Sequence, residues 1–127
     1  MLGKEGFRTS TDNVSAIDDA AIVLIAVRPK QMDTVLDQLA GKLDSSRHVI
    51  ISTVSDVRIE DIQQHVGSSI SIIRAMPNIG VAVGASMTCL ACHTSTPSNA
   101  KDLASELFSH LGRVEFIEEE QLTPATA

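Results

Sequence analysis

The sequence predicts an α/β fold built on a mostly parallel, doubly wound sheet. Short runs of β-branched residues alternate with amphipathic helical patterns, and the connections between them are short. The first run, residues 21–27, is apolar on both faces, which is typical of a strand inside a parallel sheet. The chain has 127 residues with no internal repeat or linker, so we expect a single domain over residues 1–127.

The N-terminal part is expected to form a short helix, a strand and a longer helix. Residues 11–13 are typical helix-capping residues, and Val14, Ile17 and Ala21 follow them at helical spacing. After the strand at 21–27, Pro29 suits the first turn of the next helix. That helix has one apolar stripe, made of Met32, Val35, Leu36, Leu39 and Leu43.

The central part repeats the strand and helix pattern. Residues 48–52 are expected to form a strand, and residues 59–66 a short helix that ends at Gly67. A third strand is expected over residues 70–74. It leads into residues 76–80, whose Pro, Asn and Gly are typical of a turn.

The C-terminal part is expected to add a weaker strand at 86–92, a helix and a last strand. Thr96 suits the N-cap of the helix and Pro97 its first helical position, and Gly112 suits its end. Val114 and Phe116 alternate with a charged residue, as in a strand. Residues 118–127 are polar, and the three glutamates at 118–120 are interpreted as a solvated charge run. The helix that begins at Thr96 and Pro97 has its apolar positions at Ala100, Leu103, Ala104, Leu107, Phe108 and Leu111.

Composition excludes several classes of function. Ten Lys and Arg against sixteen Asp and Glu give a net charge of −6, and aromatic residues make up 2% of the chain. Binding to nucleic acid needs clustered cations or aromatic platforms, so we expect no nucleic-acid partner. No apolar run is long enough to span a membrane, and no secretion signal is recognised. We therefore expect a cytoplasmic protein without membrane contact.

Metal, haem and nucleophile chemistry find little support. Residues 89–93 read C-x-x-C-H, but strand alternation would point Cys89 and Cys92 to opposite faces. One C-x-x-C supplies at most half of a zinc site. We name no metal ligand and no catalytic residue, because the sequence shows no nucleophile–base pair and no carboxylate dyad. It also contains no G-x-G-x-x-G motif.

Ligands of open α/β sheets bind at the carboxyl ends of the strands. Residues 26–29, 52–56 and 74–78 follow three such ends, and each segment changes from apolar to small or polar residues. A ligand-facing edge and ordinary polar loops remain equal alternatives. For single residues the simpler interpretations are solvent exposure for Arg28, a carboxylate partner for Arg74, and local capping or turn roles for Asn13 and Asn78.

Several motifs, taken in order, resemble the N-terminal domain of pyrroline-5-carboxylate reductases. They recur at that family's spacing over nearly the whole chain, and R-x-M-P-N with an upstream A-V-[KR]-P is a fairly specific combination. The F420-dependent NADP oxidoreductases share the fold and look less similar. The motifs are Thr11-Asp12-Asn13, residues 25–31, residues 49–52, residues 73–78, Leu111-Gly112 and Glu118-Glu119.

The resemblance implies a partial Rossmann-like domain that binds NADP or NAD. The family reduces 1-pyrroline-5-carboxylate to L-proline by transfer of a hydride from the nicotinamide. Its cofactor contacts fall here on Asn13, on the loop Ala26, Val27, Arg28 and Pro29, on Ser52, Thr53, Val54 and Ser55, and on Met76, Pro77 and Asn78.

The sequence also departs from this family. The family's first βαβ unit, with its glycine fingerprint, and its C-terminal helical domain have no counterpart here. Val54, Ser55 and Asp56 replace Ala-Ala-Gly, so we expect added bulk and a carboxylate to crowd or repel a pyrophosphate. Residues 79–80 and 85–86 also differ from the family pattern.

Three hypotheses of function follow. The first is a divergent, partial relative of pyrroline-5-carboxylate reductase that is inactive as this chain alone and binds its cofactor weakly or not at all. The second is a non-catalytic interaction module that forms homo-oligomers through the edge strand 21–27, because an unpaired apolar edge is a template for another chain. The third is a fragment of a longer enzyme, or a chain whose partner supplies the missing βαβ unit.

Overall fold

The structure, a computed structural model, describes residues 12–17, 20–77 and 86–122. Within these residues the chain forms one five-stranded sheet in the order β1-β2-β3-β4-β5. The first three strands are parallel, β4 runs antiparallel to β3, and β5 is parallel to β4. The strands are β1 (Ile22–Ile25), β2 (Val49–Ser52), β3 (Ser71–Pro77), β4 (Ser86–Ala91) and β5 (Gly112–Phe116). The expected α/β fold with a mostly parallel, Rossmann-like sheet is confirmed.

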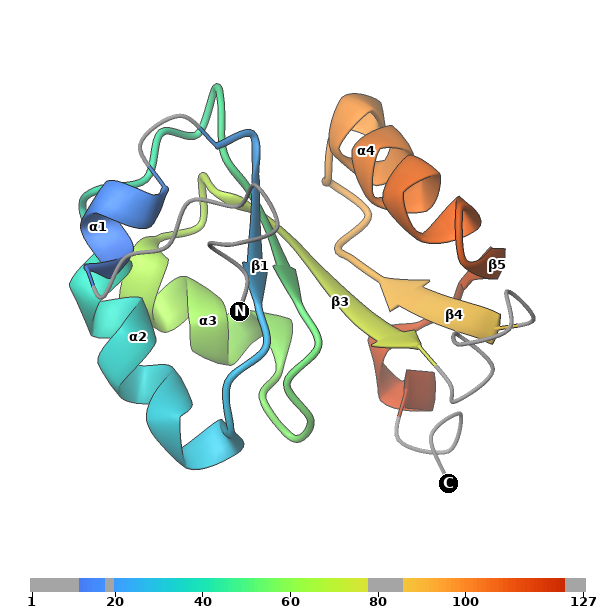
Figure 1. The fold of residues 1–127 in the computed structure, drawn as a ribbon, viewed down its shortest axis with the longest axis horizontal. Helices are drawn as coiled ribbons and strands as arrows, with labels where there is room; N and C mark the ends of the chain where they lie inside the picture. Colours follow the sequence, from blue (N-terminus) through green and yellow to red (C-terminus); the bar gives the residue numbers. More distant parts are fainter. Residues whose placement is uncertain (1–11, 18–19, 78–85, 123–127) are drawn as a thin grey trace, which may run out of the picture.

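Helices cover both faces of the sheet (Figure 1). On one face, α2 (Met32–Leu39), α3 (Ile59–Val66) and Ile17, which follows α1 (Asn13–Ala16), share a core with Ile50 and Ile72. On the other face, α4 (Ser98–Ser109) packs against Ile51 and Ile73. Neighbouring residues of a strand point to opposite faces, which explains why consecutive isoleucines enter different cores. The strands follow the order of the chain, so the described residues contain no reversal of strand order.

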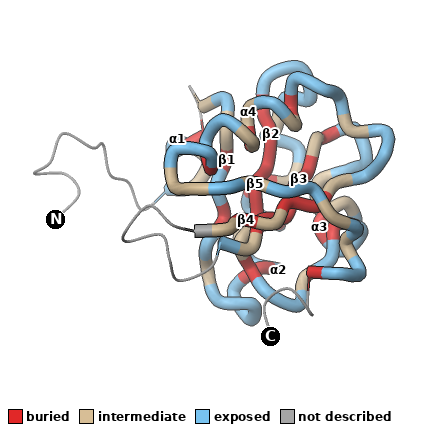
Figure 2. Tube along the Cα trace, turned by 90° about the vertical axis from the view of Figure 1, so that its right-hand side faces the viewer, coloured by how far each residue is buried: buried red, intermediate tan, exposed pale blue. Residues whose placement is uncertain are grey.

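The helical patterns account for the two cores. The predicted stripe of α2 is buried at Met32, Leu36 and Leu39. Asp12 caps α1 by accepting a hydrogen bond from the Val14 N–H at 3.0 Å, as the capping prediction requires. Gly67 ends α3 with a φ of 96°, a value that favours glycine. Figure 2 shows buried residues along the central strands and exposed residues on the surrounding loops and helix surfaces.

The turn predicted at 76–80 is wrong for its first two residues. Met76 and Pro77 continue β3 and pair with Cys89 and Thr88 of β4. The antiparallel partner extends β3, and Pro77 is tolerated because it is the last residue of the strand. Asn78 and the remainder of the predicted turn lie outside the described residues.

Three smaller predictions are corrected at the ends of elements. Gly112 opens β5 with a φ of 153°, and α4 already ends at the cap residue His110. Pro97 occupies the N-cap position of α4 that we assigned to Thr96. β1, which its apolar composition alone suggested to be interior, lies at the edge among the described strands, as the hypothesis of an edge strand at 21–27 expects, and Leu24 is 53% exposed there.

Candidate functional site

The carboxyl ends of β1 and β2 lie side by side. In the sheet register, Ile25 pairs with Ser52, and Ser52 in turn pairs with Arg74. The Thr53 N–H donates a hydrogen bond to the Ile25 carbonyl oxygen at 3.0 Å, one residue beyond the strand pairing. The segments that follow β1 and β2 therefore start from the same edge of the sheet, where ligands of such folds bind.

The end of β3 reaches beyond this edge. Pro77 comes three residues after Arg74, the residue level with Ser52, so the strand extends about 10 Å further at roughly 3.3 Å per residue. Met76 is half-buried and Pro77 is exposed on this extension. The predicted site residues Met76 and Pro77 therefore lie beyond the ends of β1 and β2, while Asn78 is outside the described residues.

A hollow of about 350 Å³ lies beside the end of β1. Asn13 of α1, Val27 after β1, and Lys30 just before α2 line it together. The side-chain amide of Asn13 donates a hydrogen bond to Gln38 Oε1 at 2.5 Å on the same hollow. A second hollow of about 280 Å³ shares Asn13 and Val27 and continues along β1 among mostly apolar residues. The structure thus brings Asn13 next to Ala26 and Val27 of the segment 26–29.

The segment between β1 and α2 forms a tight turn. Arg28 is exposed and extended, and its N–H donates to Gln31 Oε1 at 3.3 Å. Pro29 is the first residue of the 3₁₀ helix η2 (Pro29–Gln31), in agreement with its predicted place at a helix start. Ala26 and Arg28 both present themselves to solvent at this edge.

The loop from β2 to α3 is partly buried. Ser52 is buried, and its Oγ accepts a hydrogen bond from the Val54 N–H at 3.2 Å. Val54 is only 3% exposed and packs in the core with α2 and α3, so the expectation that its bulk crowds a ligand is wrong. Ser55 and Asp56 are exposed. Asp56 adopts a φ of 64°, a left-handed conformation that Asp tolerates better than most residues and that favours glycine.

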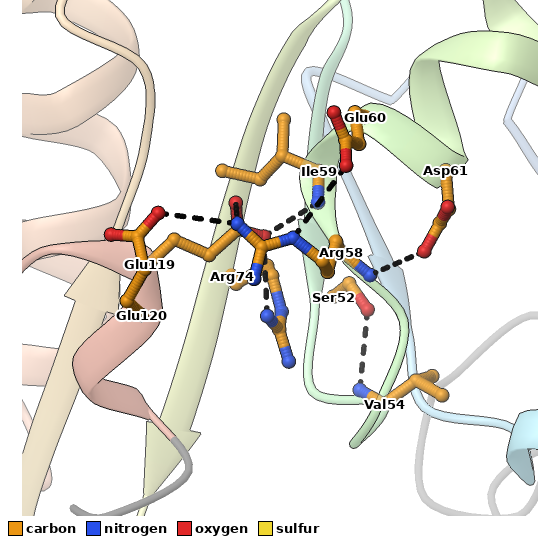
Figure 3. A network of polar contacts seen from close by, with 9 residues as sticks. All are labelled: Ser52, Val54, Arg58, Ile59, Glu60, Asp61, Arg74, Glu119 and Glu120. Carbon is orange, nitrogen blue, oxygen red and sulfur yellow. Dashed lines mark hydrogen bonds and ion pairs between the residues drawn. The ribbon is translucent and has the colours of Figure 1, made fainter.

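A buried ion pair lies next to this loop (Figure 3). Arg74 of β3, with a side chain 5% exposed, places Nη1 3.1 Å from Glu119 Oε2, and the Glu119 side chain is 11% exposed. The same oxygen accepts the N–H of Ile59, the first residue of α3, at 2.6 Å. The predicted carboxylate partner of Arg74 is confirmed. The interpretation of Glu119 as part of a solvated run is wrong, because the chain folds back after β5 and places it against α3.

The glutamates beside Arg58 shape the local charge. Arg58 Nη2 lies 3.4 Å from Glu119 Oε1 and 3.2 Å from Glu120 Oε1. The Glu119 carboxylate is the largest influence that raises the pKa of Arg58. Hydrogen bonds from the backbone N–H of Glu120 and from the Arg58 side chain lower the pKa of Glu120. Arg58 and Arg74, the two cations described near the loop, are therefore both paired with carboxylates.

Sequence reasoning missed part of the hollow's lining. Lys30, Thr34 and Gln38 contribute polar atoms from η2 and α2, and Gln31 lies next to them. Their spacing of four residues is a signal that was available, because positions i, i+4 and i+8 lie on one face of a helix. The long-range placement of Glu119 has no comparable local signal.

The described residues offer no metal centre, since no group of three His, Cys, Asp or Glu among them is arranged to hold an ion. In the same part of the chain, no helix has the length and apolar character needed to cross a membrane. Cys89 and Cys92 are both free thiols.

The fold is that of a Rossmann-like domain with a hollow at the carboxyl edge of its sheet. In agreement, a family described as NADP oxidoreductase coenzyme F420-dependent matches residues 3–56. Similarity over the whole chain is more specific. Pyrroline-5-carboxylate reductase 1 of Dictyostelium discoideum is 39% identical over 137 residues, which cover 99% of this chain and 25% of that protein.

Solved structures agree with the sequence comparison. The pyrroline-5-carboxylate reductase of Coxiella burnetii superimposes with a TM-score of 0.86 at 30% identity, covering 94% of this chain and 44% of that one. The Plasmodium falciparum pyrroline carboxylate reductase, solved with NADP bound, gives 0.83 at 24% identity over 91% of this chain and 44% of its own, and so shows a shared fold. This chain is similar in sequence and fold to the pyrroline-5-carboxylate reductases. It spans from a quarter to about half of the length of these relatives.

Proposed function

We propose that this chain forms part of the NAD(P)H-binding region of a pyrroline-5-carboxylate reductase-like oxidoreductase. The observation that carries the proposal is the meeting of Asn13, Val27 and Lys30 around one hollow at the carboxyl end of β1. The similarity over 99% of the chain to a reductase of Dictyostelium discoideum supports it. The reaction of that family, reduction of 1-pyrroline-5-carboxylate to L-proline, supports a proposed role in proline biosynthesis.

The residues around the hollow suit the polar parts of a dinucleotide. The Lys30 ammonium offers three donors for a phosphate, and the Asn13 and Gln38 amides offer donors and acceptors for a ribose. When bound, the cofactor supplies a hydride to the carbon of a C=N bond. The chain's own residues bind and orient it, and we assign none of them a catalytic role.

The chain alone is proposed to bind NADPH weakly and to be inactive. The sequence contains no G-x-G-x-x-G motif, and helix N-termini next to such motifs usually hold the pyrophosphate. Exposed Asp56 adds a negative charge to the loop after β2. Both features reduce the free energy available for binding an anionic dinucleotide.

Calorimetry and a kinetic assay test this proposal together. We expect isothermal titration with NADPH to give a Kd weaker than about 100 μM, which corresponds to less than about 5.5 kcal/mol. We expect no oxidation of NADPH by 1-pyrroline-5-carboxylate above the buffer rate. Residual affinity should fall in Lys30→Met and persist in Lys42→Met, which lies outside the two hollows at this edge. Micromolar binding or turnover by the unmodified chain would contradict the proposal.

A second candidate function is self-association through β1. Leu24 is exposed, and among the described strands β1 has a hydrogen-bonded neighbour on one side alone. We propose a second copy of the chain as the partner, because two identical edges can pair with each other about a two-fold axis. Size-exclusion chromatography with light scattering should then show a dimer at high concentration, and a monomer at every concentration would exclude it.

We further propose a cytoplasmic location. The two cysteines are free thiols, which fits a reducing compartment. Cell fractionation tests this, and recovery of the protein in a membrane or secreted fraction would contradict it.

A further inference from the structure

The segment 117–122, which we call the C-terminal clasp, returns from β5 to the start of α3. It leaves the sheet with the Ile117 N–H donating to the Leu90 carbonyl oxygen at 2.8 Å. It then forms the 3₁₀ helix η4 (Glu119–Gln121), and Leu122 is fully buried. Figure 3 shows two of the clasp's three glutamates, Glu119 turned toward Arg58, Ile59 and Arg74, and Glu120 turned toward Arg58.

Glu119 joins three parts of the fold that are distant in sequence. Its carboxylate contacts Arg74 of β3, Arg58 at the end of the β2–α3 loop, and the N–H of Ile59 at the start of α3. A carboxylate at a helix N-terminus is favoured by the helix dipole. Arg74 depends on this contact in particular, because its buried Nε has no hydrogen-bond partner among the described atoms.

These contacts fix one end of the β2–α3 loop, residues 53–58. The other end is held by the hydrogen bond from the Thr53 N–H to Ile25 and by that from the Val54 N–H to Ser52 Oγ. Between the two ends, Ser55 and Asp56 are exposed, and Asp56 has a left-handed backbone. A short loop with a strained residue keeps one shape when both of its ends are held.

We propose that Glu119 is a positioning residue that holds the β2–α3 loop in its ligand-facing shape. The clasp thereby links the loop to the chain segment that follows β5. The statement that the loop faces a ligand rests on the proposed nucleotide function. The effect of Glu119 on the loop is measurable without any nucleotide.

Hydrogen exchange of the free protein tests the proposal. We expect Glu119→Gln to accelerate exchange of the backbone amides of residues 53–59 about tenfold. The matched variant Glu120→Gln makes the same change one residue later, where the side chain is 70% exposed, and should change these rates less than twofold. The amides of Ile50 and Ile51 in β2 report global unfolding, so they should accelerate by the larger factor that the loss of global stability sets and not by the tenfold factor of the loop.

Equal acceleration of the loop and β2 amides in Glu119→Gln would show a merely structural role and overturn the proposal, as would unchanged loop rates. If Glu119→Gln does not fold, Arg58→Met decides, since Arg58 is partly exposed and touches the same carboxylate. It should accelerate the loop amides about threefold, and no acceleration would overturn the proposal. Absence of any NADPH binding by the wild type would instead count against the nucleotide function and leave this exchange result unaffected.

Discussion

The ion pair between Arg74 and Glu119 gives an asymmetric prediction for stability. The charge of each side chain is removed in turn, by Glu119→Gln and by Arg74→Met. Without Glu119, Arg74 keeps its charge in a site where 5% of the side chain is exposed and no other carboxylate is in contact among the described residues. Without Arg74, Glu119 still accepts the Ile59 N–H at 2.6 Å and faces Arg58 at 3.4 Å.

The magnitudes follow from these remaining contacts. Leaving a buried charge unpaired costs about 3–5 kcal/mol, and the neutral amide of Gln recovers part of this, so we expect a loss of about 3 kcal/mol for Glu119→Gln. Arg74→Met removes one hydrogen bond to a charged group and leaves no unpaired buried ion, so we expect about 1–2 kcal/mol. Both losses are smaller than the roughly 5–15 kcal/mol that stabilises a typical domain.

Urea unfolding followed by circular dichroism measures both losses, with Glu120→Gln as the control. Glu120 is mostly exposed, so its ion pair with Arg58 should contribute little to stability. The reasoning is refuted if Arg74→Met destabilises the protein as much as Glu119→Gln. It is also refuted if Glu119→Gln is indistinguishable from the control.

Three further predictions concern the core, the edge strand and pH. Leu36→Ala, in the buried stripe of α2, should lower the free energy of unfolding by about 2–5 kcal/mol in the same urea assay, and a loss below about 1 kcal/mol would contradict the packing. If β1 mediates self-association, Leu24→Lys should shift light scattering toward the monomer while Leu107→Lys on α4 should not; equal behaviour of the two variants argues against β1. Hydrogen bonds from the Ser46 hydroxyl and N–H lower the pKa of Asp44, so its contribution to stability is present above the unfolded pKa and is lost as pH falls through the folded one. Ser46→Ala should raise the Asp44 pKa in an NMR titration, and an unchanged pKa would contradict this cause.

Local patterns predicted most of the fold. The stripe of α2, the capping role of Asp12 and the glycine at the end of α3 all follow from rules that act within one or two helical turns. The two runs of isoleucine in β2 and β3 are buried on both faces, as their composition indicates. These features depend on neighbours in sequence, which a single sequence displays.

The wrong predictions concern residues whose conformation or burial depends on segments distant in sequence. Pro77 suggests a turn by its local chemistry, but pairing with β4 keeps it in β3. Gly112 suggests a helix end, but it begins β5 because that strand pairs with β4 from Ser86 onward. Glu119 stands in a run of charged residues that suggests solvent exposure, but it is buried against Arg74 of β3, which is 45 residues away in sequence. Long-range pairing leaves no local periodicity to read.

The candidate site divides in the same way. The segment 26–29 was predicted from its place after a strand, and Asn13 from the family resemblance; the structure places Asn13 on one hollow with Ala26 and Val27 of that segment. The orientation of Val54 was not predictable from the loop sequence, because its direction into the core depends on how α3 packs. The polar positions Lys30, Thr34 and Gln38 were readable from helical spacing and were overlooked.

The measurement that addresses the central claim most directly is a chemical-shift titration of the ¹⁵N-labelled chain with NADPH. The account predicts perturbations in fast exchange, confined to the amides of Asn13, Val27, Lys30 and residues 53–56. The chemical shifts of the amides of α4, on the other face of the sheet, should not change. Perturbations centred on α4 or β5, or none up to about 10 mM NADPH, would contradict the claim that this edge receives a nicotinamide nucleotide.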